Sequence, residues 1–149
     1  MFNIQASYEF NAPADAVWNY LEDFGHIERW WPQDANAIKI ERIVLEGKGV
    51  GMTRHIYNAF MTLPVSERLD GLDPSTKTLR LAIVGERPAG LTFYQAVGQV
   101  VDLPGNRCRL DYRGEFTTHS GQPEEAHAFL AEAYRLMFVG LTAALARAT

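Results

Sequence analysis

Residues 123–148 of this 149-residue chain read PEEAHAFLAEAYRLMFVGLTAALARA, a pattern that predicts one long helix. Proline suits the first position of a helix, and the two glutamates after it favour the positive end of the helix dipole. No second proline interrupts the run, so a helix over 124–147 would be roughly 36 Å long. Apolar residues recur at steps of three and four in two adjacent rows, Phe129, Leu130, Ala133, Met137, Gly140, Leu141 and Ala144 beside Leu130, Tyr134, Phe138, Leu141 and Leu145. This wide apolar band needs a broad partner surface.

The partner surface is predicted to be a curved antiparallel sheet, because the chain before the helix is patterned as strands. Phe2 to Phe10 alternates apolar and polar residues, which is typical of a half-buried strand. Six further strands, separated by turns rich in glycine, proline and aspartate, are predicted over Ala37–Leu45, Val50–Asn58, Met61–Leu69, Lys77–Val84, Leu91–Val101 and Arg107–Thr118. Two short helices are predicted between the first two strands, one starting near Pro13 and one over Phe24–Trp31.

Length and charge limit the classes of function. One domain over residues 1–149 is expected, and a chain of this size buries about 68–70% of its unfolded surface. The formal net charge of −4 argues against general binding to nucleic acid. Cys108 is the only cysteine, so no internal disulfide is possible, which suits a reducing cytoplasm. Glu132 and Arg135 interrupt the apolar band of the long helix, so no membrane span is predicted.

Hairpin pairing of successive strands predicts which side chains share a face of the sheet. The predicted partners are Arg54 with Glu67, Ile56 with Val65, Leu69 with Leu79, Leu81 with Tyr94, and Ala96 with Tyr112. These pairs gather nearly all large apolar residues of four strands on one inner face. Phe93, Val97 and Val101 would then face outward, so either the register of this strand differs or another subunit, as in a homodimer, covers this outer patch.

Several short motifs follow one another along the chain, and each is weak by itself. They are Asn11-Ala12-Pro13 with Val17-Trp18, Trp30-Trp31-Pro32, Gly49-Val50-Gly51 with Arg54, Val65-Ser66-Glu67-Arg68-Leu69, Tyr94, and Arg109-Leu110-Asp111-Tyr112 before Phe116. In this order, and followed by an amphipathic end helix, they resemble the START-like (SRPBCC) superfamily, especially its small bacterial polyketide cyclase/dehydrase-like members.

The resemblance implies an α+β helix-grip fold. In that fold a seven-stranded curved antiparallel sheet wraps around a long C-terminal helix, and two short helices lie between strands one and two. The resemblance also implies a cavity for a hydrophobic or amphipathic small molecule, such as a lipid. It does not imply a particular reaction, because this fold hosts carriers, receptors, cyclases and chaperone partners.

Arg54 and Glu67 are the first candidates for a binding site, because the predicted register places them opposite each other among apolar residues. An isolated ion in an apolar wall costs several kcal/mol, so the two should pair. The pair could anchor a carboxylate or hydroxyl of a ligand, or it could be an ion pair that only fixes the hairpin. Tyr94, Tyr112 and Tyr134 could orient a ligand through their hydroxyls, or they could be core tyrosines bonded to the backbone.

The predicted ligand-binding residues would line a cavity between the sheet and the long helix. They are Arg54, Ile56, Glu67, Leu81, Tyr94, Ala96, Tyr112, Phe129, Tyr134, Met137, Phe138 and Trp30. Ala96, Gly98 and Gly114 have small side chains on the inner face. They would either admit the helix closely or leave room for a ligand, in a cavity below about 1,000 Å³.

Three classes of function remain open. The leading hypothesis is a carrier or sensor that binds a small hydrophobic molecule. The second is a cofactor-free cyclase, aromatase or dehydratase, whose acid/base candidates are Arg54, Glu67, Tyr94, Tyr112 and His127. The third is a protein-interaction module that uses the outer patch. The histidines do not show metal-ligand spacing, so neither a metal nor a cofactor is expected.

Overall fold

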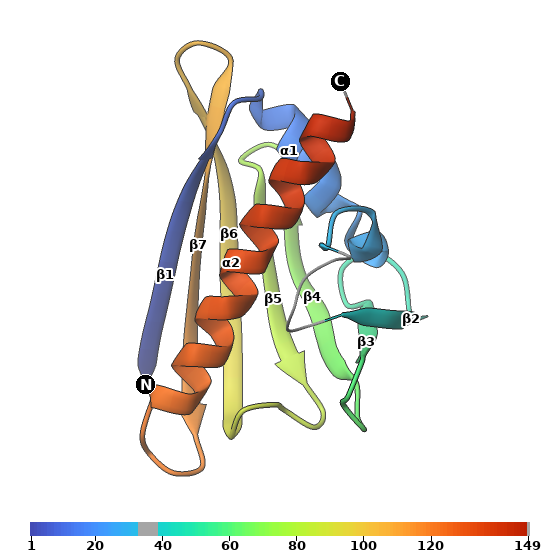
Figure 1. Cartoon of the computed structure of the whole chain (residues 1–149), viewed down its shortest axis with the longest axis vertical. Helices are drawn as coiled ribbons and strands as arrows, with labels where there is room; N and C mark the ends of the chain where they lie inside the picture. Colours follow the sequence, from blue (N-terminus) through green and yellow to red (C-terminus); the bar gives the residue numbers. More distant parts are fainter. Residues whose placement is uncertain (33–38, 149) are drawn as a thin grey trace.

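The computed structural model describes residues 1–32 and 39–148, in which a curved sheet holds one long helix against its concave face (Figure 1). The elements are β1 (Phe2–Phe10), α1 (Ala14–Glu22), the 3₁₀ helix η1 (Phe24–Arg29), β2 (Ile40–Glu46), β3 (Thr53–Asn58), β4 (Val65–Asp73), β5 (Thr78–Val84), β6 (Leu91–Leu103), β7 (Arg107–Thr118) and α2 (Glu124–Arg147). This arrangement confirms the predicted α+β helix-grip fold. The first two residues of the predicted strand Ala37–Leu45 lie outside the described residues.

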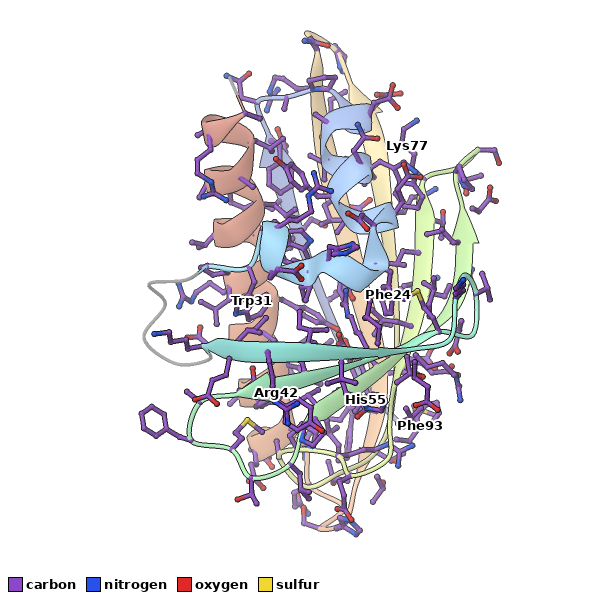
Figure 2. The ribbon with its side chains drawn as sticks, turned by 90° about the vertical axis from the view of Figure 1, so that its right-hand side faces the viewer. Phe24, Trp31, Arg42, His55, Lys77 and Phe93 are labelled. Atoms are coloured by element: carbon purple, nitrogen blue, oxygen red, sulfur yellow. The ribbon has the colours of Figure 1, made fainter. Side chains whose placement is uncertain are left out.

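The sheet has seven strands in the order β1-β7-β6-β5-β4-β3-β2, and every neighbouring pair is antiparallel. The first strand therefore pairs with the last one, while β2 forms the opposite edge. Helix α2 crosses the concave face diagonally, and α1 lies beside its C-terminal half (Figure 1). Figure 2 shows Phe24 and Trp31 in the region between η1 and strands β2 and β3.

The registers are partly as predicted. Strand β3 pairs with β4 as expected, with Arg54 opposite Glu67 and Ile56 opposite Val65. The other three predicted pairs are wrong by two residues: Leu69 pairs with Leu81 rather than Leu79, Leu81 with Ala96 rather than Tyr94, and Ala96 with Gly114 rather than Tyr112. A shift of two keeps every side chain on its predicted face, because side chains alternate along a strand. The predicted inner face is therefore correct, whereas the predicted partners on neighbouring strands are not.

Helix α2 spans the predicted residues and is the core helix of the fold. By length and composition alone it could cross a membrane. Here it buries nine residues, from Ala126 to Ala144, within the sheet and its flanking helices. Gly140 is required for this packing, because a Cβ atom at this position would overlap the carbonyl oxygen of Trp30 and lie 2.7 Å from Cδ of Pro32. The weakest helix former in α2 is thus the point where the Trp30–Pro32 segment touches its backbone.

The outer face of β6 carries the three apolar residues that were predicted there. Phe93, Val97 and Val101 are each half-buried. They alternate along β6 with the buried inner residues Tyr94, Ala96 and Val100. Their outward orientation confirms the predicted face of this strand. A homodimer through this patch stays a prediction.

Candidate functional site

A cavity of about 100 Å³ lies between the concave face of the sheet and the N-terminal half of α2. Nine of the twelve predicted binding residues line it, namely Trp30, Arg54, Ile56, Glu67, Tyr94, Tyr112, Phe129, Tyr134 and Met137. Among the described lining residues only Met61, in the connection between β3 and β4, is exposed. Whether these residues bind a ligand stays a prediction.

Three of the predicted binding residues lie elsewhere in the core. Leu81 and Ala96 face each other across β5 and β6, and neither is among the residues that line the cavity. Phe138 lies toward the other edge of the sheet, where its ring stacks on Tyr8 with centroids 5.3 Å apart. These three side chains are buried packing residues, and the described sheet residues that line the cavity come from every strand except β1.

Arg54 and Glu67 form a partly buried ion pair at the wall of this cavity. The Nε and Nη2 atoms of Arg54 lie 2.9 and 2.8 Å from the same carboxylate oxygen, Oε1 of Glu67. The third nitrogen, Nη1, donates to the backbone carbonyl of Phe24 at 2.9 Å, and the guanidinium stacks 3.9 Å from the centre of the Phe24 ring. Every guanidinium nitrogen is therefore held by protein, and Arg54 fastens η1 to the sheet.

The second oxygen of Glu67 is the unused part of this ion pair. Within residues 1–32 and 39–148, no group donates a hydrogen bond to Glu67 Oε2. The Glu67 side chain is 17% exposed and belongs to the cavity lining. The carboxylate thus has one oxygen fixed by Arg54 and one that can accept a hydrogen bond.

Three tyrosines form a cluster beside Glu67. The hydroxyl oxygens of Tyr94 and Tyr134 lie 2.6 Å apart, and the ring of Tyr112 meets that of Tyr134 edge-on with centroids 4.8 Å apart. Burial raises the pKa of all three hydroxyls, that of Tyr94 and Tyr112 well above its usual value, and the nearby Glu67 carboxylate adds to the rise. The three hydroxyls therefore stay protonated and uncharged near neutral pH.

Two glycines make room for these tyrosine rings. A Cβ atom at Gly114 would lie 2.5 Å from the hydroxyl oxygen of Tyr134, and one at Gly98 would lie 2.8 Å from the Tyr112 ring. Small residues on the inner face were predicted either to admit the helix or to leave room for a ligand. At these two positions the space is instead filled by the aromatic side chains that wall the cavity.

Asn58 is a cavity residue that the sequence analysis did not assign. Its side chain is buried, and its Nδ2 donates to the carbonyl of Ile56 at 3.3 Å. Its Oδ1 is buried and has no hydrogen-bond partner among the described residues. Strand alternation could have identified it, because Asn58 follows Arg54 and Ile56 on the same face of β3.

One further candidate from the sequence, His127, does not reach the cavity. His127 lies in the first turns of α2, where it is exposed, so it is not placed to act as a general base there. Cys108 is buried, and burial raises the pKa of its thiol, which disfavours a reactive thiolate. The polar chemistry of the cavity therefore comes from Asn58, Glu67 and the tyrosine cluster.

Together, the curved sheet, the long terminal helix and the cavity between them define a helix-grip protein with a pocket under the helix. The chain belongs to the family described as polyketide cyclase / dehydrase and lipid transport, whose model matches residues 1–148. This membership confirms the resemblance to the START-like superfamily. No curated protein matches the chain.

Solved structures show the same fold at low sequence identity. Norcoclaurine synthase from Thalictrum flavum superimposes with a TM-score of 0.77 at 16% identity, covering 95% of this chain and 91% of that one. The protein XoxI from Bacillus cereus gives a TM-score of 0.81 at 23% identity, with coverage of 97% and 95%. A protein from Thermobifida fusca gives 0.74 at 28% identity, with coverage of 95% and 89%.

Proposed function

We propose that this protein binds a small, largely apolar molecule in the cavity under α2 and acts as its carrier or sensor in the cytoplasm. The observation that supports this most directly is a mostly apolar cavity with a few inward polar groups, in a member of a family associated with lipid transport and polyketide chemistry. The single free cysteine is compatible with a reducing compartment.

The size of the cavity limits its occupant. Ligand pockets usually measure about 300–1,000 Å³, whereas this cavity measures about 100 Å³. An engineered apolar cavity of about 150 Å³ is large enough to hold benzene. This cavity is smaller than that, so one small ring or a short branched chain is the upper limit for its occupant, and a larger lipid would require α2 or the β3–β4 connection to move.

The test is binding of toluene and related one-ring probes, followed by NMR shifts of the protein. Ala133→Leu adds a larger side chain to the cavity lining and should abolish probe binding. Ala131→Leu makes the same change two residues earlier at an exposed position, and it should leave binding unchanged. Probe binding that is equal in both variants would show that the cavity is not the site.

A second candidate function is a cofactor-free cyclase or dehydratase. One specific observation favours it: Glu67, whose Oε2 accepts no hydrogen bond from the part of the chain that the structure describes, lines the same cavity as three tyrosines with protonated hydroxyls. The carboxylate could accept a proton from an activated carbon while a tyrosine donates one to a carbonyl or hydroxyl oxygen. If so, Glu67→Gln should lower turnover of a small polyketone roughly 10²–10⁴-fold. Turnover that survives Glu67→Gln and Tyr134→Phe would eliminate this candidate.

A further inference from the structure

Two residues in the largely apolar lining of the cavity carry a hydrogen-bond acceptor that has no donor among the described residues. Asn58 belongs to the cavity lining, and its buried Oδ1 has no partner within residues 1–32 and 39–148, although most buried polar atoms in proteins are paired. Glu67 Oε2 lies in the same lining and accepts no hydrogen bond from the described residues. An unpaired buried acceptor weakens the fold unless another molecule supplies a donor.

The orientation of the Asn58 amide is set by its neighbour. Its Nδ2 donates to the carbonyl oxygen of Ile56 at 3.3 Å. A flipped amide would bring Oδ1 against that carbonyl, so that two acceptors would face each other. The atom left without a protein partner is therefore the acceptor, and the ligand must supply the donor.

The cavity also disfavours anions. Arg54 is the only cationic residue in the described lining, and its three nitrogens already bind Glu67 and the carbonyl of Phe24. A ligand carboxylate would meet the oxygens of Asn58 and Glu67 without a free cation to balance it. The earlier idea that Arg54 anchors a carboxylate thus finds no support in this geometry.

We propose that the cavity selects a one-ring molecule that carries a hydroxyl or amine donor, which hydrogen-bonds to Asn58 Oδ1, with Glu67 Oε2 as a second acceptor. This proposal rests on the cavity being the binding site. The pocket would then select ligands that carry a hydrogen-bond donor, whereas a purely apolar pocket would select ligands by shape and apolar surface area.

The experiment compares three probes of similar shape by calorimetry: toluene without a donor, p-cresol with a hydroxyl donor, and benzoate with acceptors only. An apolar cavity should prefer toluene, because burial of an unpaired hydroxyl is costly. A cavity with unpaired acceptors should bind p-cresol at least about tenfold more tightly than toluene, and it should not bind benzoate detectably.

Two variants assign the effect to named atoms. Asn58→Leu removes the acceptor and should bring the affinity for p-cresol down to that for toluene or below it. Asn19→Leu makes the same change on the exposed surface of α1 and should alter neither affinity. If Asn58→Leu does not fold, Glu67→Gln provides the second test. It keeps one oxygen for Arg54, turns the other acceptor into a donor, and should let benzoate bind.

The outcomes separate this inference from the proposed function. Toluene binding as tightly as p-cresol, with both lost in Ala133→Leu, would overturn the donor requirement and leave the cavity as the binding site. A preference for p-cresol that persists in both Asn58→Leu and Glu67→Gln would overturn the assignment to these acceptors. No binding of any probe would overturn both proposals.

Discussion

The hydroxyl oxygens of Tyr94 and Tyr134 lie 2.6 Å apart and join strand β6 to helix α2 inside the core. Removal of one hydroxyl leaves the other buried without this partner, which typically costs about 1–3 kcal/mol. We therefore expect Tyr134→Phe and Tyr94→Phe each to lower the free energy of unfolding by about that amount. The double variant should lose clearly less than the sum. Urea unfolding in a double-mutant cycle measures the coupling, and Tyr57→Phe on the outer face serves as control. Strictly additive losses would contradict the coupling.

Loss of Glu67 alone should destabilise the protein more than loss of both Arg54 and Glu67. Glu67→Leu leaves the largely buried guanidinium with only the Phe24 carbonyl, and loss of one partner of a buried ion pair costs about 3–5 kcal/mol. The partial exposure of Glu67 places the expected loss at the lower end of that range. Replacement of both residues by leucine should be less harmful than Glu67→Leu alone. Chemical unfolding of the three variants tests this order, and a double variant less stable than either single one would refute it.

Alkaline pH should destabilise the fold through the buried tyrosines. The pKa values of Tyr94, Tyr112 and Tyr134 are raised in the folded state, whereas those of the unfolded chain lie near 10. Their contribution to stability is therefore complete below about pH 10 and is lost as pH rises toward the folded pKa values. Each fully protonated buried tyrosine then steepens the loss by about 1.4 kcal/mol per pH unit.

This pH dependence can be measured by urea unfolding across the alkaline range together with tyrosinate absorbance. The variant with Tyr94→Phe and Tyr134→Phe should lose about two-thirds of the tyrosine contribution to the slope. The unsubstituted protein is the reference, so contributions to the slope that both proteins share cancel in the comparison. An unchanged slope in the double variant would show that the alkaline transition has another source.

Gly140→Ala should destabilise the protein although alanine is the better helix former. Alanine gains about 1 kcal/mol of helix propensity over glycine. The new methyl group would overlap the carbonyl oxygen of Trp30, and overpacking of this kind against backbone costs about 1–3 kcal/mol or more. We expect a net loss in the free energy of unfolding. Val139→Ala at the exposed neighbouring position should change it by less than about 0.5 kcal/mol. A stabilised Gly140→Ala variant would contradict this account.

The long helix and the faces of the strands could be predicted from the sequence because they depend on local periodicity. The apolar rows and the absence of proline specify α2 over 124–147, and alternation specifies which residues of β3 to β7 face inward. The hairpin registers could not be fixed in the same way. A slip of two residues preserves every face, so the pattern does not distinguish Leu81 opposite Ala96 from Leu81 opposite Tyr94.

The candidate site was predictable to the extent that it depends on faces alone. The Arg54–Glu67 pair and the inward tyrosines follow from alternation, whereas the exclusion of Leu81, Ala96 and Phe138 depends on the three-dimensional path of α2 over the sheet. The engagement of Arg54 by the Phe24 carbonyl joins residues 30 positions apart and leaves no periodic signal. The unpaired acceptor of Asn58 likewise appears only when its surroundings are known.

The two halves of helix α2 have different roles in the structure. The N-terminal half, with Phe129, Ala133 and Tyr134, walls the cavity, while the C-terminal half is clamped by the backbone at Trp30 and by the hydroxyl of Tyr20, which donates to the Ala144 carbonyl. Substitutions in the first half can therefore reshape the cavity while the second half maintains the fold. In one helix, the N-terminal half can therefore change to fit new ligands, while the C-terminal half has to stay constant to keep the protein folded.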